Sequence, residues 1–195
     1  MRFFVVYSRL CQNAKLAISR ARGHWGLPLV WLAGITLGVC LALLVTESEY
    51  VCTVAKMLAG SRPFGPAFAG YLALLTVGHA VVYVNCRFRK RVFVGVYFVF
   101  AGFFVGRAVT LSIAVSAVVG AVSAFLFVLP CGLLCFFVVY LLAIELSSVV
   151  LTTLNFSCNR RVLVRIGRYW LVGAVALAVF VLIIWGGIEL IIVAV

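Results

Sequence analysis

The stretch from Val92 to Leu154 constrains the fold more than any other part of the sequence. It runs for 63 residues with only two charged side chains, Arg107 and Glu145. About 20 apolar residues in a helix are enough to cross a hydrocarbon layer roughly 30 Å thick, and backbone groups in lipid must hydrogen-bond within their own helix. Further apolar runs lie on both sides of this stretch. The sequence therefore predicts an all-α, polytopic transmembrane helical bundle that forms a single integral membrane domain over residues 1–195.

The composition excludes an ordinary water-soluble domain. Hydrophobic residues make up 67% of the chain and charged residues only 10%, which leaves too little polar surface to cover a soluble core. The formal net charge of +12 comes from short basic clusters between the apolar runs, where membrane proteins carry them. No basic domain is present that is large enough to grip a duplex. We therefore expect the lipid bilayer as a partner, and no nucleic acid.

The apolar runs and the basic clusters together predict the order of the membrane crossings. Residues 1–26 are basic and are expected to form an amphipathic helix at the cytoplasmic surface, not a cleavable signal peptide. Residues 27–195 form the bundle. Because basic loops stay in the cytoplasm, the N-terminus is expected there. The expected full spans are Leu27–Val45, Ala67–Cys86, Val92 to about Thr110, about Cys131 to Thr152, and one from Tyr169 toward the C-terminus.

The segment Ser112–Pro130 is expected to form a re-entrant hairpin. The basic clusters at 87–91 and 160–168 should both lie in the cytoplasm, so an even number of full crossings must separate them. The segment is rich in small residues, which allow the close packing that a re-entrant backbone needs, and Pro130 breaks the helix at its end. In the alternative, the segment crosses the membrane, which gives six spans and violates the charge rule.

Ionisable side chains at membrane depth are candidate site residues, because each costs roughly 2.5–3.5 kcal/mol at the centre of a helix and usually has a partner. Arg107 and Glu189 are both expected near the outer ends of their spans, as an intramembrane ion pair or as separate side chains that reach the outer headgroups. Glu145 and His79 are expected at similar depth toward the inner leaflet. They are predicted to be hydrogen-bonded between helices, or alternatively to form a proton-carrying pair in a transporter.

Two GxxxG patterns predict close helix packing. They are GITLG, with Gly34 and Gly38, and GFFVG, with Gly102 and Gly106. Glycines four residues apart let two helix backbones approach each other in a membrane. We expect this packing within one chain in preference to dimerisation.

The sequence holds no recognisable catalytic or metal-binding pattern. It has no aspartate, and its only histidines are His24 and His79. HExxH, P-loop and GxSxG patterns are absent. The cysteines fall mostly in apolar runs, where a thiol is usually a small packing residue. The sequence therefore predicts a non-enzymatic protein with no catalytic, cofactor or metal site and no small-molecule substrate.

The middle of the chain, residues 98–148, resembles the core of the stage II sporulation protein M family. The resemblance rests on an aromatic run into a GF-x-x-G turn, a small-residue segment, and an LP pair before an apolar helix. In this chain these are Gly102-Phe103, Gly106, residues 112–124, and Leu129-Pro130. Glu189 would match a glutamate in the family's last helix. The chain departs from the family at Ala101, where a basic residue is common, and at Cys131-Gly132, where a polar amide is common.

This resemblance implies a scaffold in a bacterial cell membrane that anchors peptidoglycan-degrading enzymes while the forespore is engulfed. The loop at 46–66 and the predicted hairpin would be its contact surfaces. The alternative is a small transporter subunit, the substrate-capturing component of an energy-coupled uptake system. Convergence of Glu145, His79 and Arg107 on one cavity would favour the transporter.

Overall fold

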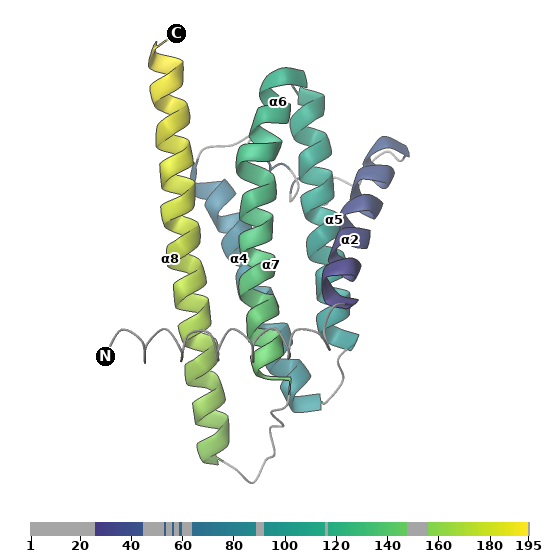
Figure 1. Cartoon of the computed structure of the whole chain (residues 1–195), viewed down its shortest axis with the longest axis vertical. Helices are drawn as coiled ribbons and strands as arrows, with labels where there is room; N and C mark the ends of the chain where they lie inside the picture. Colours follow the sequence, from purple (N-terminus) through teal and green to yellow (C-terminus); the bar gives the residue numbers. More distant parts are fainter. Residues whose placement is uncertain are drawn as a thin grey trace, which may run out of the picture.

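The structure is a computed structural model, and it describes residues 26–44, 53, 56, 59, 64–88, 92–115, 117–147 and 156–194. Within these ranges the side chains of 64, 66, 67, 115, 117, 156–159 and 185–194 are not described. The predicted amphipathic segment at 1–26 lies, apart from Gly26, outside the described residues. The elements are α2 (Gly26–Leu44), α4 (Phe64–Phe88), α5 (Val92–Val115), α6 (Ala117–Ser123), the π-helix η1 (Ala124–Val128), α7 (Leu129–Glu145) and α8 (Phe156–Ala194) (Figure 1).

Five stretches of helix among the described residues are long and apolar enough to cross a membrane. They are Gly26–Leu44, Phe68–Phe88, Val92–Ala114, Val118–Glu145 and Arg160–Ile184. The prediction of an all-helical bundle with five full spans is therefore confirmed. The protein is a multi-pass helical membrane protein.

The predicted re-entrant hairpin at 112–130 is wrong. α5 continues to Val115, and α6, η1 and α7 follow one another as a single apolar stretch of 28 residues, so the two spans meet in a turn at one end of the bundle (Figure 1). Small residues let α5 and α6 approach each other closely at this turn, because a Cβ added to Gly120 would collide with the carbonyl oxygen of Ser112. An even number of full spans still separates the basic clusters, but both spans are longer than expected.

Pro130 does not break the span. It lies in the first turn of α7, directly after η1. In η1 the backbone N–H of Leu129 bonds to the oxygen of Ala124, five residues back. A proline has no N–H to donate, and its ring collides with the carbonyl four residues earlier in a regular α-helix. The wider π-turn admits one extra residue, and the helix passes the proline without a break.

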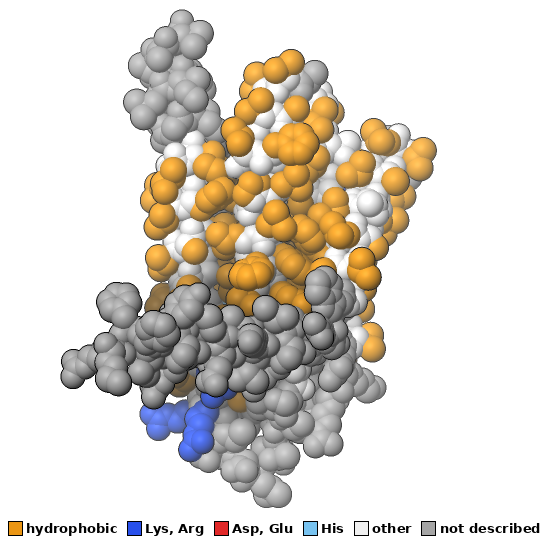
Figure 2. All heavy atoms as spheres, in the orientation of Figure 1, with side chains coloured by type: hydrophobic (Ala, Val, Ile, Leu, Met, Phe, Trp, Pro, Cys, Tyr) orange, Lys and Arg blue, Asp and Glu red, His pale blue; other side chains and the backbone are white. Residues whose placement is uncertain are grey.

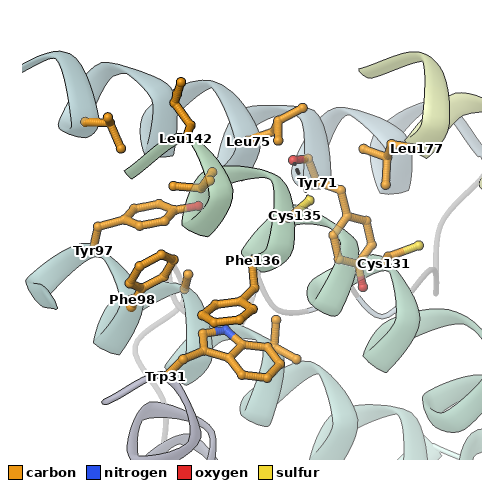
Figure 3. Close-up of a cluster of buried hydrophobic side chains, with 14 of the residues drawn as sticks. Trp31, Tyr71, Leu75, Tyr97, Phe98, Cys131, Cys135, Phe136, Leu142 and Leu177 are labelled. Carbon is orange, nitrogen blue, oxygen red and sulfur yellow. Dashed lines mark hydrogen bonds between the residues drawn. The ribbon is translucent and has the colours of Figure 1, made fainter. Parts of the chain in front are cut away.

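The bundle has a three-helix centre and two edge helices. α4, α5 and α7 pack on one another; α2 lies against α5 at one edge, and α8 lies against α4 and α7 at the other (Figure 1). Aromatic rings fill the centre between these helices. Phe136 stacks on Trp31 with ring centroids 4.8 Å apart and also contacts Phe98 at 4.9 Å (Figure 3). Trp31 therefore connects the edge helix α2 to α7.

Apolar side chains cover the middle of the surface, as expected for helices that face lipid (Figure 2). The exposed arginines among the described residues gather at one end, which we call the basic end; the end where α5 meets α6 is the turn end. The basic end carries Arg87 at the end of α4 and Arg160, Arg161, Arg165 and Arg168 in the first turns of α8. The fifth span was expected to begin at Tyr169, but α8 already begins at Phe156. The basic segment is therefore helical and continuous with the span.

Candidate functional site

The four glycines of the two GxxxG patterns meet at one helix crossing. A Cβ added at any of them would collide with a carbonyl oxygen of the facing helix. The pairs are Gly34 with Val99, Gly38 with Phe103, Gly102 with Trp31, and Gly106 with Ile35. Residue numbers rise together in these pairs, so α2 and α5 run parallel. The structure thus brings the four predicted packing residues together within one chain.

This crossing is made by backbone against backbone. In a glycine, a second hydrogen takes the direction of the missing Cβ, so each of the four points at a carbonyl oxygen. Such Cα–H···O contacts recur where helices pack closely, and each contributes about 0.5–1 kcal/mol. The obstacle to a larger side chain is the partner's backbone, which cannot rotate out of the way. The position of α2 is therefore fixed tightly against α5.

Arg107 follows the last of these glycines in α5. Its side chain is buried, with 4% exposed, and its guanidinium carbon lies 5.4 Å from the centroid of the Phe103 ring, a cation–π contact. It lies 15 residues after Val92, about 22 Å along α5 from the basic end. Glu189 belongs to α8, but its side chain lies outside the described residues. The predicted ion pair between Arg107 and Glu189 stays a prediction.

Glu145 ends α7 and forms an ion pair with α8. Arg165 donates from Nη1 to Oε1 of Glu145 at 3.1 Å, and the Tyr169 hydroxyl lies close to the same carboxylate. The two charged side chains are 53% and 31% exposed, so the pair lies at the surface of the basic end. Surface pairs of this kind contribute about 0.2–1 kcal/mol. The pair connects the two helices on either side of the segment 148–155.

His79 is bonded within its own helix. The ring is buried, and its Nδ1 donates to the carbonyl oxygen of Leu75 at 2.7 Å. Near the basic end, Cys86 Sγ lies 3.7 Å from the Leu146 oxygen, which aligns α4 with the end of α7. Cys86 is level with the end of α7, and His79 precedes Cys86 by seven residues. His79 therefore lies about 10 Å from Glu145, toward the turn end of the bundle. The structure does not bring His79 and Glu145 together as a pair.

The three ionisable residues expected to converge in a transporter lie at three depths. Glu145 is at the basic end, His79 about 10 Å further in, and Arg107 about 22 Å from that end. Described side chains of α4, α7 and α8 bond across the bundle in other ways instead. Trp170 Nε1 donates to Thr76 Oγ1 at 3.0 Å, which connects α8 to α4. These polar groups connect helices and do not surround one site.

The sequence analysis did not anticipate a buried cluster beside the π-helix. The Tyr71 hydroxyl donates to the Val128 oxygen at 3.4 Å, and Cys135 Sγ donates to the Tyr71 oxygen at 3.6 Å (Figure 3). Cys131 lies in the same layer, fully buried. Cys131 and Cys135 are four residues apart in α7, so both thiols lie on one face of the helix, but nothing in the sequence indicated Tyr71 as the residue they face. The cluster fastens α4 to α7.

Comparisons with known proteins identify no relative. No protein-family model matches the chain, and no curated protein or solved structure matches it. The likeness to the stage II sporulation protein M family therefore depends entirely on the residues quoted above.

Proposed function

We propose that this multi-pass membrane protein is a non-enzymatic scaffold that holds partner proteins at the membrane. The observation that carries the proposal is the glycine crossing of α2 and α5. It fixes the first span in position, and with it the end of α2 at Leu44, after which the segment 46–66 follows in the sequence. A fixed exit point for a loop suits a protein that presents a contact surface.

The polar contacts support the same reading. A substrate-binding subunit of a transporter needs polar groups around one site near the middle of the membrane. Here Arg107, His79 and Glu145 lie at three depths, and the described hydrogen bonds of His79 and Glu145 run within α4 or between α7 and α8. The Glu145 contact holds two helices together, which is what a scaffold requires.

The family resemblance suggests which partners to look for. It makes them peptidoglycan-degrading enzymes on the outer side of a bacterial cell membrane during engulfment of the forespore. By the positive-inside rule, the basic clusters at 87–91 and 160–168 favour a cytoplasmic basic end and an external turn end. The loop at 46–66 would then face the cell wall.

In-cell crosslinking tests this proposal. The tagged chain is crosslinked in its own host, purified in mild detergent, and its partners are identified by mass spectrometry. We expect a peptidoglycan-degrading enzyme, with recovery reduced several-fold in Gly102→Ile, which forces α2 away from α5. The matched control is Gly95→Ile in the same helix, where an added Cβ meets nothing within 4 Å. Recovery of a pair of ATPase subunits instead would overturn the scaffold and establish the transporter.

A further inference from the structure

One face of α8 changes from charged to apolar along its length. Counting along the helix in steps of four and three residues gives a single stripe whose members are all exposed. The stripe consists of Arg161, Arg165, Arg168, Val172, Val175 and Val179. Steps of three and four residues keep side chains on one side of an α-helix, so the arginines lie in line with the valines.

The dimensions of this stripe match one leaflet of a bilayer. Arg161 and Arg168 are seven residues apart, about 10 Å, and the distance from Arg168 to Val179 is about 16 Å. Half of a typical hydrocarbon core is about 15 Å thick. When the valines lie in one hydrocarbon leaflet, the arginines therefore lie among its headgroups. The three valines are 66%, 55% and 50% exposed, so the apolar part of the stripe is open to lipid.

The charges at the basic end favour a negatively charged occupant. Among the described residues of this end, Glu145 has the only carboxylate, and this carboxylate forms an ion pair with Arg165. That contact uses one nitrogen of a guanidinium that carries five N–H donors, and the Arg165 side chain is 53% exposed. Glu145 therefore positions Arg165 between Arg161 and Arg168 without neutralising all three arginines.

We infer that this stripe binds one anionic phospholipid of the surrounding leaflet. Its phosphate lies against Arg161, Arg165 and Arg168, and its acyl chains run along Val172, Val175 and Val179. Planar guanidinium groups match phosphate oxygens in bidentate hydrogen bonds, and basic residues next to a membrane span attract anionic headgroups. A soluble phosphate ion would use the arginines alone, whereas a phospholipid uses the whole stripe.

Native mass spectrometry of the full chain in detergent micelles tests this inference. The protein is titrated separately with phosphatidylglycerol, phosphatidylcholine and inorganic phosphate. We expect saturable binding of one phosphatidylglycerol. The double variant R161Q/R168Q is expected to weaken it about 30-fold, because a surface arginine contributes about fivefold to anionic lipid binding. The double variant R87Q/R160Q removes two charges from the same end but off the stripe, and it should change the affinity less than about threefold.

Circular dichroism and gel filtration establish that both variants are folded before the comparison. Equal weakening by the two double variants would show general attraction by net charge and would overturn the site. Equal binding of phosphatidylcholine, or binding of inorganic phosphate as tight as that of phosphatidylglycerol, would overturn lipid recognition. A protein that binds none of the three but purifies with another chain covering α8 would also overturn it, since the stripe would then be a protein interface.

Discussion

α2 and α8 lie at opposite edges of the bundle. Backbone contacts hold α2 in place, whereas side-chain contacts hold α8 in place. α2 packs on α5 through glycines that place backbone against backbone. α8 packs on α4 and α7 through side chains: Leu177 and Val181 are fully buried, and Trp170 and Arg165 supply hydrogen bonds. Lipid tails are as apolar as leucine, so burial alone does not drive helices together in a membrane. α2 is therefore held by the close approach of two backbones, and α8 is held by specific side-chain contacts.

This difference predicts opposite sensitivities to added and removed volume. A side chain added at the α2–α5 crossing meets carbonyl groups that cannot move aside. A glycine has no side chain to shorten, so a substitution at these positions cannot remove volume. At the α8 edge, side chains can be shortened, and each loss affects one contact.

The largest expected effect is at the glycine crossing. Gly102→Ile should destabilise the protein by about 3 kcal/mol, because the backbones of α2 and α5 have to separate. Unfolding in mixed micelles containing increasing dodecyl sulfate, followed by circular dichroism, measures it. Gly95→Ile in the same helix should change stability by less than about 0.5 kcal/mol, since an added Cβ there meets nothing within 4 Å. Similar losses in both variants would show that helix propensity, and not the crossing, is responsible.

A smaller loss is expected from shortening a buried side chain of α8. Leu177→Ala should lower the free energy of unfolding by about 2 kcal/mol, because Leu177 is fully buried and its removal leaves a cavity. Leu182→Ala on the same helix is the control, since Leu182 is 58% exposed. The same unfolding experiment should find it within about 0.5 kcal/mol of the parent. Equal effects would mean that α8 does not pack as described.

The hydrogen bond between Trp170 and Thr76 ranks next. A double-mutant cycle of Trp170→Phe and Thr76→Val should give a coupling energy of about 0.6 kcal/mol, the average for such bonds in membrane proteins. The cycle separates the bond from the lost indole surface, which the single variants also change. A coupling energy of zero would show that the 3.0 Å contact contributes no stability.

The ion pair between Arg165 and Glu145 should contribute least. A cycle of Arg165→Gln and Glu145→Gln is expected to give about 0.3 kcal/mol at low salt, falling further at 1 M salt as the exposed charges are screened. A coupling above about 2 kcal/mol would mean that the pair is shielded from water, contrary to its exposure.

The sequence was sufficient for the number of spans and for the packing glycines, because both depend on local composition. The sequence was not sufficient to distinguish a re-entrant hairpin at 112–130 from a turn between two full spans. Small residues at 112–124 fit a re-entrant segment as well as a tight turn between two long helices, and only the length of α5 and of the stretch Val118–Glu145 decides between them. The predicted helix break at Pro130 was wrong for a related reason. The π-turn that accommodates the proline has no distinctive sequence pattern.

The partner of Glu145 was missed because it depends on where a helix begins. With the fifth span expected to begin only at Tyr169, Arg165 had no defined position. Once α8 begins at Phe156, Arg165 lies on the helix at the level of the last residue of α7, and the ion pair follows. Contacts between helices depend on their register, which periodicity within one helix does not specify.

The length of α8 has one more consequence. Its 39 residues extend about 58 Å, roughly twice the thickness of a hydrocarbon core. A helix that exceeds the hydrocarbon thickness tilts, or its ends stand in water. Because α8 is packed on α4 and α7, it cannot tilt alone, and any tilt is shared by the bundle. Membrane thickness therefore sets how much of the last turn or two of α8 projects from the lipid surface, and a thinner bilayer exposes more of it.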